Sequence, residues 1–297
     1  MKVLLFGRNG QVGWELQRSL APLGELVALD RGSTLHGDLS RPEGLRETVR
    51  SVAPQLIVNA AAYTAVDQAE AQAQLAQTVN ATAPGVLAEE AARLGALLVH
   101  YSTDYVFDGS GEAPWTETSP TGPLSVYGRS KLDGEHAVRA SGCRHLILRT
   151  SWVHAARGSN FPKTMLRLAR ERETLRVVDD QFGAPTGADL IADVTAHAAQ
   201  ATLHDIRHVG TYHLAAAGAT TWYACARHVI ARAAACGETL KAPVDAVKPV
   251  PTRAFPTAAR RPRNSRLATD RLCAAFGLAM PPWQAGVDRL VDEIVGI

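Results

Sequence analysis

The sequence predicts an α/β protein with a doubly wound parallel sheet and a smaller mixed α/β lobe. In the first half of the chain, short aliphatic runs alternate with longer stretches rich in Ala, Leu, Glu and Arg, which is typical of repeated βαβ units. A glycine-rich turn follows the first aliphatic run directly. Because 297 residues exceed a typical single domain, we expect one large core with a second lobe attached to it.

The strands and helices of the first half follow from the positions of the aliphatic runs. Near-continuous apolar runs are typical of parallel strands buried on both faces, and they predict strands over residues 3–6, 26–29, 56–58, 96–100 and 145–148. The stretches between them have helical periodicity and predict helices over residues 11–20, 42–52, 72–94 and 130–140. A short segment ahead of Asp38 is expected to add a further strand.

After residue 150 the alternation of strands and helices becomes less regular. The pattern predicts a helix over residues 161–171, a strand over 175–178, a helix over 190–203 and a strand over 210–214. From Thr220 it predicts an Ala-rich helix, a segment interrupted by prolines and two short terminal helices. We expect a core domain of residues 1–150 plus about 187–217, and a second lobe of about 151–186 plus 218–297.

The composition argues against several classes of partner and compartment. The 31 basic and 29 acidic side chains nearly cancel to a net charge of +2, so no broad field attracts nucleic acid or an anionic membrane. We find no signal-peptide pattern and no apolar run of membrane-spanning length, and we expect a cytoplasmic protein. The cysteines lack a C-x-x-C pair, which argues against a zinc site or a disulfide framework: Cys143, Cys225, Cys236 and Cys273.

The glycine-rich turn, G-R-N-G-Q-V-G, connects the first predicted strand to the first predicted helix. In that setting Gly7 permits a tight turn, Gly10 lets backbone N–H groups approach phosphates, and Gly13 lets the helix pack close to the sheet. The N-terminus of the helix would stabilise negative charge. We interpret the turn as a dinucleotide site in the core domain, which leaves the second lobe to bind a substrate; the alternative is a glycine-rich surface turn.

Charged residues near the second strand bear on which dinucleotide is bound. Asp30 ends that strand, where an acid accepts hydrogen bonds from the adenosine ribose and favours NAD. Arg8 and Arg31 are close in sequence and could instead pair with a 2′-phosphate, so both NAD and NADP stay open. Asp38 either binds the adenine amino group or serves as a structural residue at the start of the helix that follows it.

Tyr127 and Lys131 lie four residues apart at the start of a predicted helix, which places both side chains on one face. Because a nearby ammonium favours the phenolate, we expect the pKa of Tyr127 to fall below its usual value of about 10, so that it donates a proton to a forming alkoxide. Thr103 ends the fourth long apolar run, at the sheet edge where ligands bind in such folds. The alternatives are an exposed tyrosine stacked on a lysine stem and a threonine with a local backbone bond. The chain order of the glycine turn, Thr103 and the Tyr/Lys pair favours catalysis.

Together these residues resemble the extended short-chain dehydrogenase/reductase family, which has the Rossmann fold. The resemblance is closer to the dTDP-4-dehydrorhamnose reductases, and it covers nearly the whole chain. The segments that carry it are G-R-N-G-Q-V-G-W-E (7–15), N-A-A-A-Y-T-A-V-D (59–67), S-T-D-Y-V-F (102–107), R-T-S-W-V (149–153), D-Q-F-G-A-P-T (180–186) and A-R-R-P-R-N-S-R-L (259–267).

The resemblance implies an oxidoreductase that reduces the C4 keto group of dTDP-4-dehydro-L-rhamnose to dTDP-L-rhamnose with NADH or NADPH, for bacterial surface polysaccharide such as O-antigen. It implies that Tyr127 donates the proton, that Lys131 orients Tyr127 and binds the nicotinamide ribose, and that Thr103 completes the triad. The cofactor contacts are expected at Gly7, Gly10, Gln11, Val12, Asp30, Asp38, Leu39, Ala62, Tyr63, Thr64, Tyr127 and Lys131. The sugar nucleotide contacts are expected at Thr103, Asp104 and Trp152.

A dense basic cluster near the C-terminus supports a nucleotide-sugar ligand. Arg260, Arg261, Arg263 and Arg266 suit a diphosphate, and we take Arg260 as a candidate for substrate binding. Nucleic-acid binding is the weaker use of the cluster because no aromatic residues are interleaved with it. For any one of these arginines, a solvated loop with surface ion pairs is an equally good explanation.

The resemblance also implies a homodimer with a bound Mg²⁺ held by acidic side chains that match Glu15, Asp189 and Glu293. The family pattern has Glu where this chain has Asp189, and the shorter side chain reaches less far. Carboxylate oxygens suit Mg²⁺, but three carboxylates distant in sequence are equally consistent with ordinary surface charges.

Two other functions stay open. An epimerase or dehydratase of the same extended family would retain its nicotinamide cofactor within each turnover, whereas a reductase consumes it. A non-catalytic regulatory subunit, like that of methionine adenosyltransferase, keeps parts of the same motifs, and weak turnover with tight cofactor binding would favour it.

Overall fold

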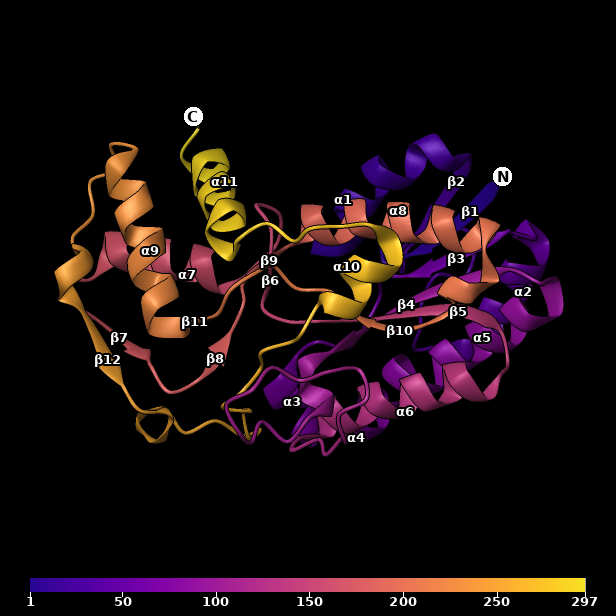
Figure 1. The fold of residues 1–297 in the computed structure, drawn as a ribbon, viewed down its shortest axis with the longest axis horizontal. Coiled ribbons are helices and arrows are strands. Elements are labelled where there is room, and N and C mark those ends of the chain that lie inside the picture. Colours follow the sequence, from indigo (N-terminus) through magenta and orange to yellow (C-terminus); the bar gives the residue numbers. More distant parts are fainter. Residues whose placement is uncertain (297) are drawn as a thin grey trace.

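Six parallel strands form the central sheet in the computed structural model, which describes residues 1–296 (Figure 1). The order across the sheet is β2–β1–β3–β4–β5–β10, and the strands are β2 (Glu25–Leu29), β1 (Lys2–Phe6), β3 (Leu56–Asn59), β4 (Leu97–Thr103), β5 (Arg144–Thr150) and β10 (Gly210–His213). Val3 pairs with Leu26 on one side and with Leu56 on the other, so the order reverses at β1. The predicted doubly wound parallel sheet is confirmed.

Helices cover both faces of the sheet. Helices α1 (Gln11–Leu20), α8 (Ala188–His204) and α10 (Asp270–Phe276) pack on one face, and α2 (Pro42–Val52), α5 (Ala83–Leu94) and α6 (Val126–Ala140) pack on the other (Figure 1). Successive strand residues point to opposite faces, and both faces are apolar: Val3 and Leu5 pack under α1 and α8, whereas Leu4 and Phe6 pack under α2 and α5.

The structure differs from the sequence expectation in two segments of the first half. The predicted helix over 72–94 consists of α4 (Ala73–Gln77), a π-helical turn (Thr78–Thr82) and α5, and it is preceded by α3 (Val66–Ala71). No strand forms between residues 31 and 41, because Asp30 accepts hydrogen bonds from the Gly32 N–H and the Ser33 hydroxyl and thereby closes a turn. Strand β2 is therefore the edge of the sheet.

A second apolar core lies in the lobe at the left of Figure 1. It is built by α7 (Phe161–Glu171), β7 (Leu175–Val178), α9 (Trp222–Ala235), β12 (Val247–Val250) and α11 (Trp283–Val295). Short pairs of strands connect this lobe to the sheet: β6 (Val153–His154) with β9 (Thr186–Gly187), and β8 (Phe182–Gly183) with β11 (Thr220–Thr221). Of the two C-terminal helices, α11 belongs to this core, whereas Leu272 and Phe276 of α10 pack with the central sheet.

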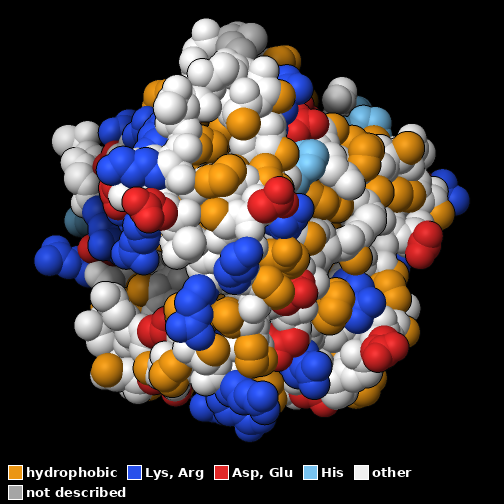
Figure 2. Space-filling model, turned by 90° about the vertical axis from the view of Figure 1, so that its left-hand side faces the viewer, with side chains coloured by type: hydrophobic (Ala, Val, Ile, Leu, Met, Phe, Trp, Pro, Cys, Tyr) orange, Lys and Arg blue, Asp and Glu red, His pale blue; other side chains and the backbone are white. Residues whose placement is uncertain are grey.

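Within residues 1–296, every cysteine is a free thiol, and Cys143 and Cys225 are buried. None of the helices in that range combines the length and the apolar character that crossing a membrane requires. On the face that the second lobe presents in Figure 2, Lys and Arg side chains are interspersed with acidic and hydrophobic ones.

Candidate active site

The glycine turn after β1 has the geometry of a phosphate-binding loop. Gly7 has φ +88°, and a Cβ there would lie 2.7 Å from the Ala61 backbone nitrogen. A Cβ on Gly13 would lie 2.1 Å from the Gly7 carbonyl oxygen, so α1 can approach the turn only with glycine at that position. No side chain caps the N-terminus of α1 at Gly10, which leaves its first backbone N–H groups available to an anion.

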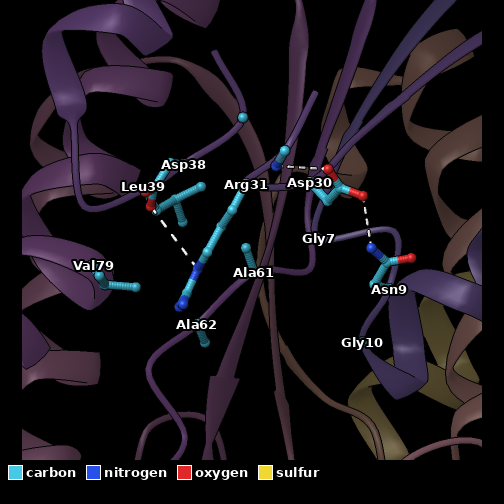
Figure 3. A pocket seen from close by; sticks show the side chains of 12 residues that line it. Gly7, Asn9, Gly10, Asp30, Arg31, Asp38, Leu39, Ala61, Ala62 and Val79 are labelled. Carbon is cyan, nitrogen blue, oxygen red and sulfur yellow. Dashed lines mark hydrogen bonds and ion pairs between the residues drawn. The ribbon is translucent and has the colours of Figure 1, made fainter. Parts of the chain in front are cut away.

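A cleft of about 460 Å³ opens beside this turn (Figure 3). It lies at the carboxyl ends of β1, β2 and β3, where the strand order reverses. Figure 3 labels ten of its lining residues: Gly7, Asn9, Gly10, Asp30, Arg31, Asp38, Leu39, Ala61, Ala62 and Val79. The expected cofactor residues among them come from three separate chain segments, and the fold brings them to one cleft.

Asp30 accepts hydrogen bonds from several donors where the chain leaves β2. Its Oδ2 accepts from Arg8 Nε at 2.8 Å and from Asn9 Nδ2 at 2.6 Å, and its Oδ1 accepts from the Gly32 N–H at 2.9 Å. The hydrogen bond from Arg8 is the main reason why the pKa of Asp30 lies below its usual value. Arg31 lines the same cleft with a largely exposed guanidinium, 4.0 Å from Asp38 Oδ1 (Figure 3). The cleft thus places a carboxylate, Asp30, close to an exposed guanidinium, that of Arg31.

Asn80, which was not predicted from the sequence, joins the loop after β3 to α6. Its Oδ1 accepts from the Tyr63 N–H at 2.8 Å, and its Nδ2 donates to the Tyr63 carbonyl and the Ser130 hydroxyl, each at 3.0 Å. Tyr63 is buried, and its own hydroxyl donates to Gln72. An asparagine inside an otherwise good helical stretch is the signal that was available, because Asn disfavours helix interiors.

Thr103, Tyr127 and Lys131 lie together at the carboxyl end of β4. Thr103 is the last residue of β4, and α6 begins at Val126 with the Ser125 hydroxyl accepting from the Gly128 N–H. A Cβ on Gly128 would lie 2.2 Å from the Tyr105 carbonyl oxygen, so this glycine lets α6 approach the strand end. The Thr103 hydroxyl lies close enough to the Tyr127 phenol to favour its ionised form.

The expected depression of the Tyr127 pKa is wrong in this structure. Burial of the phenol raises the pKa to about 12, and the nearby charge of Asp104 acts in the same direction. Lys131 does not offset this because its Nζ donates to the Tyr101 carbonyl at 2.6 Å and lies 3.4 Å from His100 Nε2. Burial lowers the pKa of Lys131 to about 8. Tyr127 is therefore fully protonated at neutral pH, as a proton donor must be.

A second cleft, of about 240 Å³, lies in the other lobe between α7, β7, α9 and the segment after β12. Its lining includes Phe161, Gln181, Trp222 and Arg261; Arg261 was predicted as part of the basic cluster, Gln181 lies in the D-Q-F-G-A-P-T segment, and Phe161 and Trp222 were not expected at a binding site. The Trp152 ring stacks on the Trp222 ring with centroids 3.4 Å apart, so Trp152 stands against the wall of this cleft. Such an apolar cleft with a few polar groups suits the base and sugar of a nucleotide.

The backbone of Trp152 is in the left-handed region, with φ +49°. A Cβ on Gly183 would lie 2.6 Å from the Trp152 ring, so the absent side chain at Gly183 makes room for the indole. A non-glycine residue in this conformation costs free energy, and the packing of the indole between Gly183 and Trp222 is what fixes it there.

A family model and curated relatives both match nearly the whole chain, and both indicate the same family. The family model described as the RmlD substrate binding domain matches residues 1–295. A dTDP-4-dehydrorhamnose reductase of Escherichia coli is 55% identical over 295 residues, which are 99% of this chain and 98% of that protein. The chain belongs to the dTDP-4-dehydrorhamnose reductase family. A reductase of Burkholderia thailandensis with the same name is 48% identical over 99% of each chain.

Solved dTDP-4-dehydrorhamnose reductases share the fold. The enzyme of Clostridium acetobutylicum superposes with a TM-score of 0.89 at 32% identity and 99% coverage of both chains. The enzyme of Bacillus anthracis, solved in complex with NADP, superposes with a TM-score of 0.88 at 34% identity, covering 98% of this chain and 99% of that one.

The four arginines of the predicted basic cluster lie in different surroundings in the structure. Arg261 lines the second cleft, donates to Asp67 Oδ2 at 2.6 Å, and has an Nη1 that is buried without a partner in residues 1–296. Arg266 stacks over the Phe182 ring, whereas Arg260 and Arg263 are exposed. Of the four clustered arginines, Arg261 borders the second cleft, together with Arg176 of β7, whereas Arg260 does not line it.

Glu15, Asp189 and Glu293 line one small pocket next to α11, as the reductase resemblance implied. Asp189 Oδ2, however, pairs with Arg289 Nη1 at 2.8 Å, so a cation already faces this carboxylate. Within residues 1–296, no group of three or more acidic, histidine or cysteine side chains is arranged to hold a metal ion. The residues present therefore do not fit a Mg²⁺ site in this chain.

Proposed function

We propose that the protein reduces the C4 keto group of dTDP-4-dehydro-L-rhamnose to give dTDP-L-rhamnose, with NADH or NADPH as the reductant. The observation that carries the proposal is the meeting of Thr103, Tyr127 and Lys131 at the carboxyl end of β4, in a chain that resembles these reductases over its full length. Tyr127 and Lys131 are proposed as catalytic residues, with Thr103 as the third member.

The bound reduced nicotinamide would supply a hydride to the carbonyl carbon of the substrate. As negative charge grows on the carbonyl oxygen, the Tyr127 hydroxyl donates its proton to that oxygen, and the Thr103 hydroxyl donates a hydrogen bond to it. Lys131 lies on the same face of α6, and its ammonium would stabilise the phenolate left on Tyr127 once it turns from the Tyr101 carbonyl toward the phenol. Since its pKa is lowered to about 8, Lys131 is still mostly charged at neutral pH.

The cofactor would lie along the first cleft, with its pyrophosphate at the N-terminus of α1. Backbone N–H groups at Gln11 and Val12 face the phosphates in this arrangement, and Asp30 or Arg31 meets the adenosine ribose. The loop of Ala62, Tyr63 and Thr64 is held by Asn80 and would border the nicotinamide half.

The sugar nucleotide would lie in the second cleft. Trp152 and Trp222 provide an aromatic wall, and the unpartnered Nη1 of Arg261 provides a donor for the diphosphate. We propose that residues 1–150 with about 187–217 bind the dinucleotide and that about 151–186 with 218–297 bind the substrate, except for α10, which packs with the central sheet. We propose that the protein acts in the cytoplasm as a homodimer and that its product is used to build surface polysaccharide. Mg²⁺ is not part of the proposal because the carboxylates do not fit it.

The test is oxidation of NADH and NADPH by the purified protein, followed by absorbance. The keto sugar is made in the assay from dTDP-4-dehydro-6-deoxyglucose and its 3,5-epimerase. Consumption of cofactor only with keto sugar, with accumulation of dTDP-rhamnose, supports the reductase. An epimerase or dehydratase would convert the sugar without net loss of cofactor, and a regulatory subunit would bind the cofactor and convert nothing.

A further inference from the structure

The hydroxyl of Thr103 has a single proton, and the surrounding groups compete for it. Thr103 Oγ1 accepts a hydrogen bond from the Tyr105 N–H at 3.2 Å, which occupies one of its two lone pairs. With the carboxylate charged, the same hydroxyl donates to Asp104 Oδ1 at 3.1 Å. One donor and one acceptor position of Thr103 are therefore left to be shared between Asp104 and whatever lies beside Tyr127.

The ionisation state of Asp104 decides how Thr103 uses them. A charged carboxylate can only accept hydrogen bonds, so the Thr103 hydroxyl donates its one hydrogen bond to Asp104 and can only accept from groups in the site. A neutral carboxyl can donate to Thr103 Oγ1, which fills the second lone pair and frees the Thr103 proton to point elsewhere. Either arrangement satisfies the 3.1 Å contact, so the same heavy-atom geometry serves both states.

Asp104 is placed where the neutral form is accessible at physiological pH. Its side chain is 2% exposed, and its Oδ2 has no hydrogen-bond partner within residues 1–296. Burial raises the pKa of Asp104 to about 7, and the nearby hydroxyls of Ser265 and Thr103 oppose this only in part. An unpartnered, buried carboxylate oxygen is costly when charged, and protonation relieves that cost.

The charged and titratable groups around Asp104 do not hold it ionised. The phenols of Tyr105 and Tyr127 are neutral, with their pKa values raised by burial. The nearby cation Arg261 forms an ion pair with Asp67 Oδ2 at 2.6 Å, which offsets its charge. Lys131 is a buried cation on α6, and its ammonium donates to the Tyr101 carbonyl.

We propose that Asp104 is a positioning residue that, when neutral, donates to Thr103 and so directs the Thr103 hydroxyl proton at the substrate carbonyl oxygen beside Tyr127. The proposal rests on the reductase function proposed above. In the neutral state Tyr127 and Thr103 both donate to the oxygen that becomes negative, whereas ionised Asp104 withdraws the second donor. Loss of one such donor typically slows a reaction by about 10²–10³-fold.

The sign of the pH dependence follows from this arrangement. Asp104 is neutral below its ionisation and charged above it, so the second donor is present at lower pH and withdrawn as the pH rises through about 7. Since kcat/KM reports the ionisations of the free enzyme, it should fall about tenfold between pH 6 and pH 8 in the wild type.

Asp104→Asn tests the proposal because its amide nitrogen can donate to Thr103 at every pH. We expect kcat/KM of D104N to change less than about threefold between pH 6 and pH 8, with the remaining decline due to Lys131. Asp108→Asn is the matched control: Asp108 is exposed, accepts from the Ser110 N–H and lies outside both clefts, so D108N should keep the wild-type profile. In a Thr103→Val background, D104N should have no further effect on the profile, because Asp104 acts through Thr103.

Infrared spectroscopy of the complex with NADP⁺ provides a readout that needs no turnover. A carboxylic acid C=O band that disappears as the pH passes through 7, and that D104N lacks, supports the proposal. A tenfold decline that persists in D104N, a flat wild-type profile, a folded D104N that is inactive at every pH, or no such band would overturn it. If the wild type consumes no cofactor at any pH, the reductase function fails instead, and the infrared titration still decides the state of Asp104.

Discussion

Glu135 accepts two hydrogen bonds from Arg149 beneath the catalytic edge of the sheet, from Nε at 2.8 Å and from Nη2 at 2.7 Å. Both side chains are almost completely buried, and Glu135 also pairs with Arg139 at 3.1 Å. This ion pair joins α6, which carries Tyr127 and Lys131, to β5. The stability of the site therefore depends on a charge pair in the core.

Glu135→Gln should destabilise the fold by about 3–5 kcal/mol, because it leaves the buried Arg149 charge without a counter-ion. Denaturant unfolding measures the change, and Glu171→Gln, in an exposed pair with Arg167, should change the free energy of unfolding by less than about 0.5 kcal/mol. Equal effects of the two variants on the free energy of unfolding would contradict this prediction.

Because pairing lowers the folded-state pKa of Glu135, the contribution of Glu135 to stability is present above the unfolded value of 4.5 and is lost as the pH falls through the lower folded value.

Tyr127→Phe removes the hydroxyl proposed as the proton donor but keeps the ring that packs edge-on against Tyr105. We expect kcat to fall about 10²–10⁴-fold, while the dissociation constant of NADPH changes less than about threefold. Steady-state kinetics and a fluorescence titration with NADPH measure the two quantities. Tyr223→Phe, which removes a hydroxyl beside Arg227 outside both clefts, is the control. Unchanged turnover of Tyr127→Phe would refute the assigned role.

Arg31→Ala should weaken NADPH more than NADH. The Arg31 guanidinium is largely exposed at the cleft and is held by a long contact of 4.0 Å with Asp38, so it can turn to a 2′-phosphate, whereas Arg8 is held by Asp30 at 2.8 Å. We expect the KM for NADPH to rise about tenfold, with the KM for NADH within about twofold of its original value. Arg172→Ala, on the exposed surface of the second lobe, should change neither value. An equal loss with both cofactors would show that Arg31 does not select the phosphate.

Chelation should leave the protein unchanged, because Arg289 already supplies the cation that faces Asp189. A metal at a hundred times its dissociation constant would add about 2.7 kcal/mol of stability, which a thermal melt detects easily. We expect the same Tm and the same mass in solution with EDTA, with added Mg²⁺, and with neither. A Tm that falls with EDTA and recovers with Mg²⁺ would restore the metal site.

The sheet and its cofactor turn could be predicted because local sequence determines them. The strands of the core are continuous apolar runs, and the spacing of Gly7, Gly10 and Gly13 has a steric reason that the structure confirms for Gly7 and Gly13. The segment after Asp30 was predicted wrongly as a strand because side-chain hydrogen bonds to Gly32 and Ser33 outweigh its weak strand pattern.

The second cleft could not be predicted from sequence because its walls come from distant segments. Phe161, Gln181 and Trp222 meet only after the second lobe has folded, and although Gln181 lies in the D-Q-F-G-A-P-T segment, nothing in that segment indicates a cleft. The Tyr127 pKa was predicted in the wrong direction because burial, which sequence does not reveal, outweighs the effect of a lysine four residues away.

The loop that follows β2 lines one end of the first cleft, and its sequence can change without disturbing the central sheet of this reductase. β2 is the edge of the sheet, and residues 31–41, several of which line the first cleft, contribute no strand to any neighbour. Substitutions or insertions there break no ladder of backbone hydrogen bonds, whereas the same changes around Thr103 would displace the reacting groups. Cofactor preference can therefore drift, or be engineered, independently of the chemistry performed at the other end of the same cofactor.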